Sequence, residues 1–145
     1  MAIHRGMIRL GTGAPVEFVD ITPTLKDWLR SNHHRDGILI VTSLHSTGRI
    51  VVNEKEPRLQ EDMVAFLRRL APAGAGHAHD RDTVDGRANA HAHLAALTMS
   101  FSETITVDRF EMELGQWQSV FFVELDGPRA ERRVMLRFIT DDVTL

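Results

Sequence analysis

The last third of the chain constrains the fold most, because it holds successive strand-like segments joined by short turns. Runs of β-branched and aromatic residues recur there, and Asp126-Gly127-Pro128 is a turn signal. The expected strands are Thr104–Val107, Glu111–Leu114, Trp117–Leu125 and Arg132–Thr140. Such short connections join antiparallel neighbours and leave no room for crossover helices. The pattern therefore predicts an α+β fold with mostly antiparallel sheets rather than a doubly wound parallel one.

The first two-thirds of the chain mixes short strands with helices. Thr22 is expected to cap a helix that has Pro23 at its first position and runs to about Asn32. The run from Ile38 to Leu44 is typical of a strand buried on both faces, and Arg49–Asn53 is expected to be a second strand of this kind. The other expected elements are strands at Met7–Leu10 and Val16–Ile21, a helix over Pro57–Leu70, and a helix that begins near Asn89 and carries Leu94 and Leu97. We expect one domain over residues 1–145.

Composition narrows the function classes. The chain has 145 residues and no cysteine, which excludes disulfides and thiolate zinc sites. Lys and Arg total 17 against 20 Asp and Glu, a formal net charge of −3, so no overall basic field exists to attract nucleic acid or an anionic membrane. The stretch from Met1 to Leu10 lacks the apolar core of a secretory signal, and we expect a cytoplasmic protein.

The chain holds eight histidines, and those in polar segments at the ends of predicted elements are candidate metal ligands. Three imidazoles with one open position form a catalytic zinc-type site. The candidates are His45, His79, His91 and His93. A helix from Asn89 would turn His91 and His93 about 200° apart, so only an extended backbone would place both rings on one face. His33 and His34 follow a helix end, where contact with the helix dipole accounts for them, and His4 is given no role.

Arginines and carboxylates near these histidines suit a phosphorylated ligand. Arg87 and Arg129 are expected to hold a phosphate with their bidentate guanidinium groups. The loop over residues 71–86 carries Asp80, Asp82 and Asp85. Three interpretations of these carboxylates stay open, namely solvation of the loop, a magnesium site, or partners that fix histidine tautomers.

Two further features have simple structural explanations. The segment Asp126–Arg129 is expected to be a turn between strands, and Trp117 is expected to be a core aromatic of a strand. The sequence has no Walker loop, no Rossmann fingerprint, no zincin motif and no Gly-x-Ser-x-Gly nucleophile elbow. The mechanisms that depend on those motifs are therefore excluded.

Taken together, these segments resemble the YjbQ-type family, often labelled secondary thiamine-phosphate synthases. The likeness extends from about Asp20 to Phe138 and rests on the order and spacing of short motifs. They are Ile21-Thr22-Pro23 with Trp28-Leu29, Asp36-Gly37, Ser43-Leu44-His45-Ser46-Thr47 with Asn53-Glu54, His79-Asp80, Asn89-Ala90-His91-Ala92-His93-Leu94, and Leu114-Gly115-Gln116-Trp117-Gln118 with Glu124-Leu125-Asp126-Gly127-Pro128-Arg129. The chain departs from the family pattern at Ser46-Thr47-Gly48, His77 and Ser100, and it keeps every histidine of that pattern.

The resemblance implies an α+β domain that forms a homotrimer, with a histidine-rich site suited to a metal near the subunit interfaces. It also implies a weak thiamine-phosphate synthase activity, a transferase reaction of thiamine biosynthesis that joins hydroxymethylpyrimidine diphosphate to thiazole phosphate. The residues expected to act in catalysis are His45, Glu54, Asp80 and Arg129. Those expected to bind the small-molecule substrate are Asn53, Arg87, Asn89, Trp117 and Gln118, and the expected metal ligands are His45, His79, His91 and His93.

Expelling diphosphate needs positive charge on the leaving group, from Mg²⁺ or from arginine. Glu54, Asp80 and Glu124 are the expected magnesium ligands. A histidine cluster favours a softer, zinc-like ion than Mg²⁺. This mismatch keeps two alternatives open. One is a metal-dependent enzyme that acts on another metabolite, and the other is a non-catalytic oligomeric binding or scaffold protein whose histidines order loops at an interface.

Overall fold

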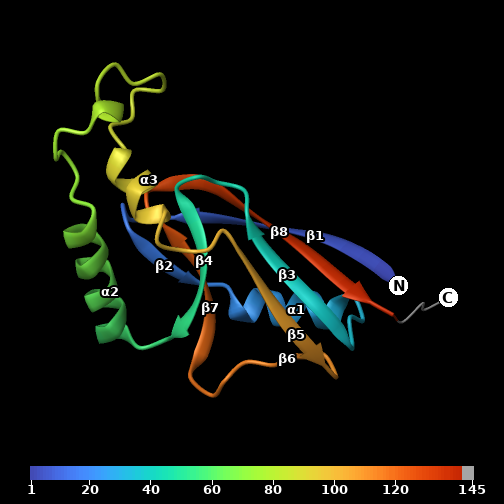
Figure 1. Cartoon of the computed structure of the whole chain (residues 1–145). Helices are drawn as coiled ribbons and strands as arrows, with labels where there is room; N and C mark the ends of the chain where they lie inside the picture. Colours follow the sequence, from blue (N-terminus) through green and yellow to red (C-terminus); the bar gives the residue numbers. More distant parts are fainter. Residues whose placement is uncertain (142–145) are drawn as a thin grey trace.

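The structure, a computed structural model, describes residues 1–141 (Figure 1). Its strands are β1 (Ala2–Thr12), β2 (Glu17–Asp20), β3 (Gly37–Ser43), β4 (Gly48–Glu54), β5 (Ser102–Asp108), β6 (Glu111–Met112), β7 (Gln118–Glu124) and β8 (Arg129–Thr140). Its helices are α1 (Thr22–Ser31), α2 (Pro57–Leu70) and α3 (Ala90–Ala96), with a 3₁₀ helix η1 (Ala78–Asp80). Every neighbouring pair of strands is antiparallel, so the expected α+β class is confirmed.

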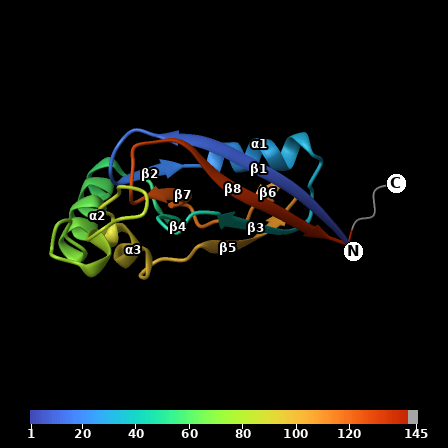
Figure 2. The same ribbon diagram turned by 90° about the horizontal axis from the view of Figure 1, so that it is seen from above.

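The strands form a five-stranded sheet in the order β1-β8-β3-β5-β6 and a three-stranded sheet in the order β2-β7-β4. The main core combines both sheets with α1. Leu25 and Leu29, four residues apart on one face of α1, are fully buried in a cluster with Leu39 of β3 and Phe122 of β7. Helix α1 lies along the sheets, whereas α2 and α3 gather at the opposite end of the molecule (Figures 1 and 2).

Strand β7 is buried on both faces. Its alternate residues face opposite sides of the sheet, so Val120 and Phe122 enter the main core. Phe121 and Val123 enter a second apolar cluster with Leu67 of α2 and the alanines of α3. Helices α2 and α3 therefore cover the side of β7 that α1 leaves open. This packing also places α3 close to the end of β7.

Strand β3 is buried on one face only, so the expectation of burial on both faces is wrong. Leu39, Val41 and Ser43 are buried, while Ile38 is 38% exposed and Ile40 is half-buried. The reason is that α2 and α3 pack on the three-stranded sheet, whereas β3 lies in the five-stranded one. A run of β-branched residues does not distinguish these two environments.

Two helix predictions need correction. Thr22 lies inside α1 and caps nothing, because its hydroxyl accepts a hydrogen bond from the Val120 amide at 2.8 Å and ties the helix to β7. Helix α3 ends at Ala96, so Leu97 lies just beyond the helix that was expected to carry it, and both Leu94 and Leu97 are exposed, at 41% and 80%. Helix α3 instead buries its small side chains, which allow it to lie close to its neighbours; they are Ala90, Ala92, Ala95 and Ala96.

Two aromatic side chains lie where the sequence did not place them. Trp117 is 67% exposed, so the expected core role is wrong; it precedes β7, whose buried positions begin at Val120. His34 is only 4% exposed and is packed among rings beyond the end of α1, so packing rather than the helix dipole accounts for it. Among residues 1–141, no helix is long and apolar enough to cross a membrane.

Candidate functional site

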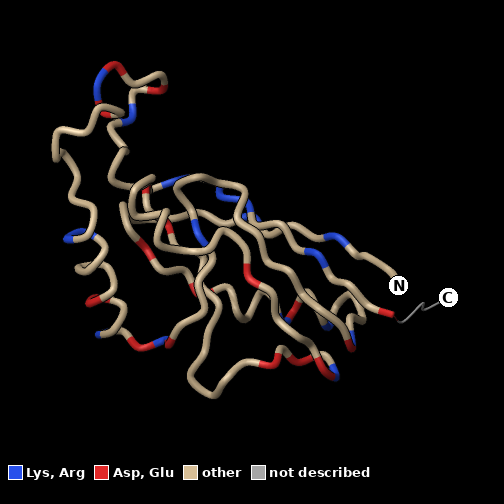
Figure 3. Tube along the Cα trace, viewed as in Figure 1, with Lys and Arg blue, Asp and Glu red and all other residues tan. Residues whose placement is uncertain are grey.

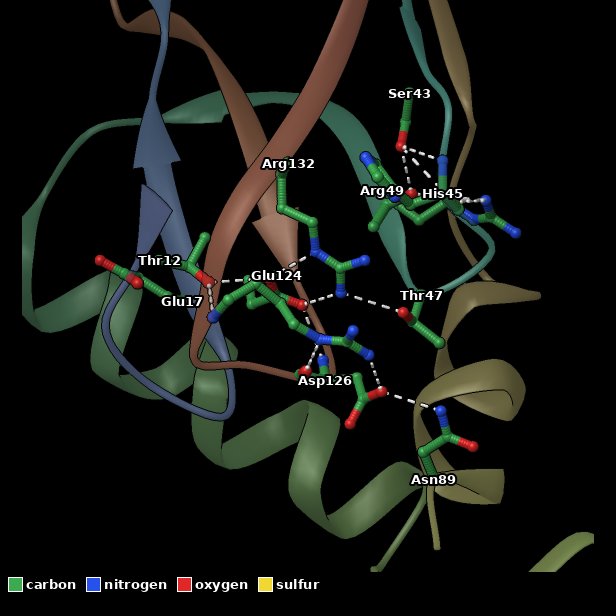
Figure 4. Close-up of polar contacts among 12 residues, drawn as sticks. Thr12, Glu17, Ser43, His45, Thr47, Arg49, Asn89, Glu124, Asp126 and Arg132 are labelled. Atoms are coloured by element: carbon green, nitrogen blue, oxygen red, sulfur yellow. Dashed lines mark hydrogen bonds and ion pairs between the residues drawn. The ribbon is translucent and has the colours of Figure 1, made fainter. Parts of the chain in front are cut away.

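A buried ion pair lies where β7 ends beside β8 (Figure 4). Glu124 is fully buried and accepts hydrogen bonds from Arg132 Nε at 2.7 Å and from Thr12 Oγ1 at 2.8 Å. Arg132 also donates from Nη2 to Thr47 Oγ1 at 3.0 Å. Burial by itself raises the pKa of Glu124, but the bonds from Arg132, the Asp126 amide and Thr12 hold that pKa below its ordinary value. The carboxylate therefore stays charged and fixes Arg132 in place.

Asp126 joins two arginines and an amide on the loop after β7. Its carboxylate accepts from Arg129 Nη2 at 2.7 Å, from Asn89 Nδ2 at 2.8 Å and from Arg87 Nη1 at 3.2 Å. Burial raises the pKa of Asp126, and the bonds from Asn89 and Arg129 with the charge of Arg87 lower it below its usual value. We call Arg87, Asn89, Asp126 and Arg129 the Asp126 cluster. Two guanidinium groups and one carboxylate give it a net positive charge.

The turn that carries Asp126 is held against the loop between β1 and β2. Gly127 donates its amide to Pro15 O at 3.1 Å. A Cβ at Gly127 would collide with the carbonyl oxygen of Ala14 and with the Glu124 side chain, so only glycine fits there. The expected turn is confirmed, and tertiary contact rather than local turn preference fixes its glycine.

His79 reaches the Asp126 cluster through Asn89. His79 Nε2 lies 3.1 Å from Asn89 Oδ1, and because an amide oxygen only accepts, this nitrogen carries the proton. Asp80 Oδ1 accepts from the Ala90 amide at 2.9 Å. Both contacts tie η1 to the start of α3, and the second oxygen of Asp80 is buried without a hydrogen-bond partner in the described chain.

His91 and His93 lie on different sides of α3, as expected for residues two apart on a helix. The His93 ring is edge-on to that of His79, with 5.0 Å between ring centroids. His91 instead lines a cavity of about 280 Å³ between the end of α2 and α3, with Leu67 and Leu125. Its Nδ1 is buried and makes no hydrogen bond to any described residue. The two rings cannot bind one metal ion together in this conformation.

His45 follows β3 and is held by the backbone of β8. Its Nε2 accepts from the Arg133 amide at 2.8 Å, so the proton of the neutral ring is on Nδ1. Burial lowers the pKa of His45, and the charges of Arg132 and Arg133 lower it further, against a smaller opposing effect of Glu124. The imidazole is therefore neutral at pH 7, and metal binding at Nδ1 would require loss of its hydrogen bond with the Arg133 amide.

The four histidines of one protomer do not form a zinc-type site. Within residues 1–141, no group of three or more His, Asp or Glu side chains is placed to hold a metal ion. Only His79 and His93 are adjacent, while His45 is bound to the Arg133 amide and His91 faces α2. A structural or catalytic zinc needs at least three protein ligands at about 2.0–2.1 Å from the metal. The residues present in a single chain do not meet this requirement.

The remaining expected site residues lie at the far end of the three-stranded sheet. In the β4–β7 register, Gly48 pairs with Glu124 at one end and Glu54 pairs with Gln118 at the other. Six residues of strand separate the two ends by about 20 Å. Asn53, Glu54, Trp117 and Gln118 are therefore not brought to the Asp126 cluster within one protomer, whereas Arg87, Asn89 and Arg129 are all part of it.

Sequence reasoning missed Arg132 and Thr12, which complete the buried ion pair. For Arg132 a signal exists, because it continues the alternation of the buried residues Val134, Leu136 and Phe138 along β8. A charged residue at an inward position indicates a buried partner. Thr12 carries no such signal, since its contact depends on how β1 ends beside β7.

The chain matches the model of the "UPF0047 protein YjbQ-like" family over residues 6–141. A UPF0047 protein of Methanothermobacter thermautotrophicus is 41% identical over 91% of this chain and 90% of its own length. The UPF0047 protein YugU of Bacillus subtilis is 31% identical over 78% of this chain and 83% of its own. A YbjQ-like protein of Sulfolobus solfataricus has a similar structure, with a TM-score of 0.87 at 31% identity over 94% of this chain and 96% of that one. The chain belongs to the UPF0047 family of YjbQ-like proteins.

Proposed function

We propose that this protein is an enzyme that binds a phosphorylated heterocycle at the Asp126 cluster, with thiamine-phosphate synthesis as its reaction. One observation carries the proposal: a single buried carboxylate holds two guanidinium groups side by side, at 2.7 Å and 3.2 Å. Arg87 and Arg129 keep side-chain exposures of 37% and 29%, so both remain accessible to a ligand. Paired guanidinium groups bind phosphate oxygens with fixed geometry.

The proposed reaction transfers a pyrimidine methylene group. The bond from that carbon to the diphosphate oxygen breaks, the electron pair leaves with diphosphate, and the thiazole nitrogen lone pair forms the new C–N bond. No proton is gained or lost, so the demand on the protein is positive charge at the leaving group. Arg87 and Arg129 supply it, because Glu124 already offsets the charge of Arg132. Asn89, which donates to Asp126, positions the two arginines rather than contacting the reacting atoms.

The proposed enzyme could use a zinc-like ion or Mg²⁺. A zinc-like ion at His45, His79, His91 and His93 would need a second protomer to supply ligands, since one chain does not gather three of them. Of the expected Mg²⁺ ligands, Glu124 is buried in the ion pair with Arg132 and Glu54 lies at the far end of the sheet. Asp80, which has one oxygen without a hydrogen-bond partner in the described chain, is the carboxylate we propose for Mg²⁺.

A homo-oligomer, with a trimer as the expected state, is part of the proposal. The outer face of the five-stranded sheet carries Met7 opposite Met135 and Ile38 opposite Ile139, with Met7 and Ile38 exposed by 39% and 38%. Arg5 and Arg137 lie opposite each other beside them, and Figure 3 shows basic positions along the β1–β8 ribbon. Exposed apolar side chains on one sheet face support an interface there. Met135→Glu is expected to lower the mass measured by light scattering, and an unchanged mass contradicts this interface.

The synthase proposal is tested by incubating the purified, untagged protein with the pyrimidine diphosphate, the thiazole phosphate and Mg²⁺ and measuring thiamine phosphate. Arg129→Gln and Arg87→Gln are each expected to lower the rate by about 10²-fold. Arg129→Lys keeps the charge and is expected to recover part of the loss. Arg69→Gln, an exposed site on α2, is the matched control and leaves the rate unchanged.

Growth provides an independent test. Expression in a thiamine auxotroph that lacks its main synthase is expected to restore growth, and Arg129→Gln is expected to abolish the rescue. No product in vitro and no rescue at good expression contradict the synthase reaction. If a fragment of the substrate such as diphosphate still binds and Arg129→Gln removes that binding, the Asp126 cluster remains a phosphate site for another metabolite.

A non-catalytic role is the second candidate, and one observation favours it. The polar groups of the Asp126 cluster bind one another, and Asn89 with Asp80 ties η1 to α3, so the whole set can serve to order a loop. On this view, Arg129→Gln and His79→Ala lower the melting temperature or change assembly, and the unaltered protein has no turnover to lose.

A further inference from the structure

A second cavity is lined by residues that follow α1 and by the turn between β5 and β6. These segments lie at the end of the molecule opposite to α2 and α3 (Figures 1 and 2). The volume of the cavity is about 430 Å³. We call it the His34 pocket. The lining side chains that matter here are three imidazoles, two phenyl rings and one guanidinium group, from His4, His33, His34, Phe110, Phe138 and Arg35. None of these residues belongs to the proposed active site.

The imidazole of His34 is the inner wall of this pocket. It is 4% exposed, stacked on Phe138 at 4.5 Å between centroids, and 4.6 Å from the rings of both Trp28 and His4. Its Nε2 is buried and has no hydrogen-bond partner among the 141 described residues. Burial, with lesser effects of His4 and His33, lowers the pKa of His34 to about 4, so the ring is neutral at pH 7. The wall is thus an uncharged aromatic surface, and its one unpartnered nitrogen is buried rather than exposed to the cavity.

Another part of the pocket lining comes from a tight turn. Arg109 and Phe110 have φ angles of 48° and 68° and are the two central residues of the hairpin between β5 and β6, where positive φ angles are usual. Two bonds hold this turn to the segment after α1, from Phe110 N to Arg35 O at 2.9 Å and from Arg109 N to Asp36 Oδ1 at 2.7 Å. His33, with a φ of 56°, ends α1 in the left-handed conformation that is common at helix C-termini. The turn thus fixes Phe110 at the pocket next to the end of α1.

The charge of the pocket comes from Arg35. This side chain is 57% exposed and contacts Asp36 through Nε only, at 3.4 Å, so its two Nη groups have no partner within residues 1–141. A guanidinium group at the rim of a pocket with aromatic walls recognises an anion attached to a flat ring. A volume of about 430 Å³ holds one substituted ring and is too small for a dinucleotide.

We propose that the His34 pocket binds a small aromatic anion, a ring carboxylate or ring phosphate, that stacks on Phe110 and the imidazoles and pairs with Arg35. The site is independent of the Asp126 cluster and of the synthase reaction. It gives a function to His4, His33 and His34, three of the eight histidines, which the proposed active site does not use.

Trp28 reports on this pocket because its ring contacts His34. Trp117→Phe leaves Trp28 as the only tryptophan of the chain, so its fluorescence can be followed during titration. Benzoate and phenyl phosphate are the probes, and they distinguish a carboxylate from a phosphate ligand. Cyclohexanecarboxylate and inorganic phosphate lack the aromatic ring and are expected to bind at least about tenfold more weakly, because they lose the stacking contacts.

Substitutions in the pocket test whether the change in Trp28 fluorescence comes from binding in the His34 pocket. Arg35→Gln and Phe110→Ala, each in the Trp117→Phe background, are expected to weaken probe binding by about tenfold or more, and Arg69→Gln on α2 leaves it unchanged. Circular dichroism confirms that each variant is folded. If neither probe gives a saturable change up to about 10 mM, the proposal is overturned. Equal binding of benzoate and cyclohexanecarboxylate overturns the aromatic requirement, and binding that survives Phe110→Ala and Arg35→Gln places the ligand elsewhere.

Discussion

The Asp126 cluster and the His34 pocket differ in whether their buried polar atoms have hydrogen-bond partners. Around Asp126 and Glu124, each carboxylate is matched by arginine, amide or hydroxyl donors at 2.7–3.2 Å. His34 instead keeps a buried nitrogen without a partner and is packed among aromatic rings. A satisfied network is rigid and specifies one arrangement, whereas a buried polar atom without a partner lowers the stability of its surroundings. The carboxylates of Asp126 and Glu124 are therefore ordered by contacts within the chain.

The largest expected loss of stability comes from removing the buried carboxylate of Glu124. Glu124→Ala leaves the guanidinium of Arg132 buried without its carboxylate, and is expected to lower the free energy of unfolding by about 3–5 kcal/mol. Chemical denaturation measures the change. Glu131→Ala is the matched control, because the Glu131–Arg9 pair is at the surface, with a Glu131 side-chain exposure of 54%, and its loss costs about 0–1 kcal/mol.

A double variant separates charge from packing in that region. Glu124→Leu with Arg132→Met removes both charges at once and is expected to regain most of the stability lost in Glu124→Ala. If Glu124→Ala and Glu131→Ala prove equally mild, the ion pair beside the Asp126 cluster does not hold the fold together.

The next largest effect is a dependence of stability on pH that His34 causes. The pKa of His34 is lowered to about 4 in the folded state, from 6.5 for a free imidazole, so the unfolded chain binds the proton more tightly. The contribution of neutral His34 is therefore complete above pH 6.5 and is lost as the pH falls toward 4. It amounts to about 3 kcal/mol, since one pKa unit corresponds to about 1.4 kcal/mol.

Denaturation at several pH values measures this contribution. His34→Phe keeps an aromatic ring against Phe138 and has no proton to bind, so it is expected to remove the His34 share of the stability lost between pH 6.5 and pH 4, while the lowered pKa of His45 still contributes its own share. At pH 7 it should be close to neutral, because it also removes the unpartnered nitrogen. An unchanged pH profile in the variant would show that other groups cause the acid loss.

A smaller effect is expected at Asn89, which links His79 to Asp126. Asn89→Ala removes two hydrogen bonds, at 3.1 Å and 2.8 Å, but leaves Asp126 with both arginines. We expect a loss of about 1–2 kcal/mol in the free energy of unfolding. Hydrogen exchange should also rise at the Ala90 amide, because one of the two contacts that tie η1 to α3 is lost. Asn53→Ala, at the exposed end of β4, controls for the loss of an amide and should change stability by less than about 0.5 kcal/mol.

The fold was predictable from the sequence where periodicity decides it. The α2 boundaries, Pro57 and Leu70, follow from helical spacing between two prolines, and the antiparallel C-terminal strands follow from short turns. Burial on both faces was assigned to β3 instead of β7 because both strands are rich in large apolar residues. The two strands differ in burial only because α2 and α3 pack on the three-stranded sheet that contains β7. No local sequence pattern predicts that contact.

The candidate site was predictable in its parts but not in its grouping. Arg87, Asn89 and Arg129 meet at Asp126, although Asp126 itself was expected to be only a turn residue. Arg129 is only three residues from Asp126, whereas Asn89 and Arg87 lie 37 and 39 residues away, on a segment whose approach depends on the whole fold. Motif spacing identifies which residues are unusual, whereas tertiary contacts decide which carboxylate they share.

The smallest stability effect is expected at Trp117. Its ring is 67% exposed, so Trp117→Ala should change the free energy of unfolding by less than about 0.5 kcal/mol. Trp28→Ala is the contrasting variant, because Trp28 packs on His34 and on the main core, and its removal should be clearly destabilising. An exposed tryptophan with no structural role is a candidate ligand contact. If Trp117 binds substrate, Trp117→Ala should raise KM while stability stays constant; a large loss of stability, with KM unchanged, would mean that an interface between protomers covers this ring.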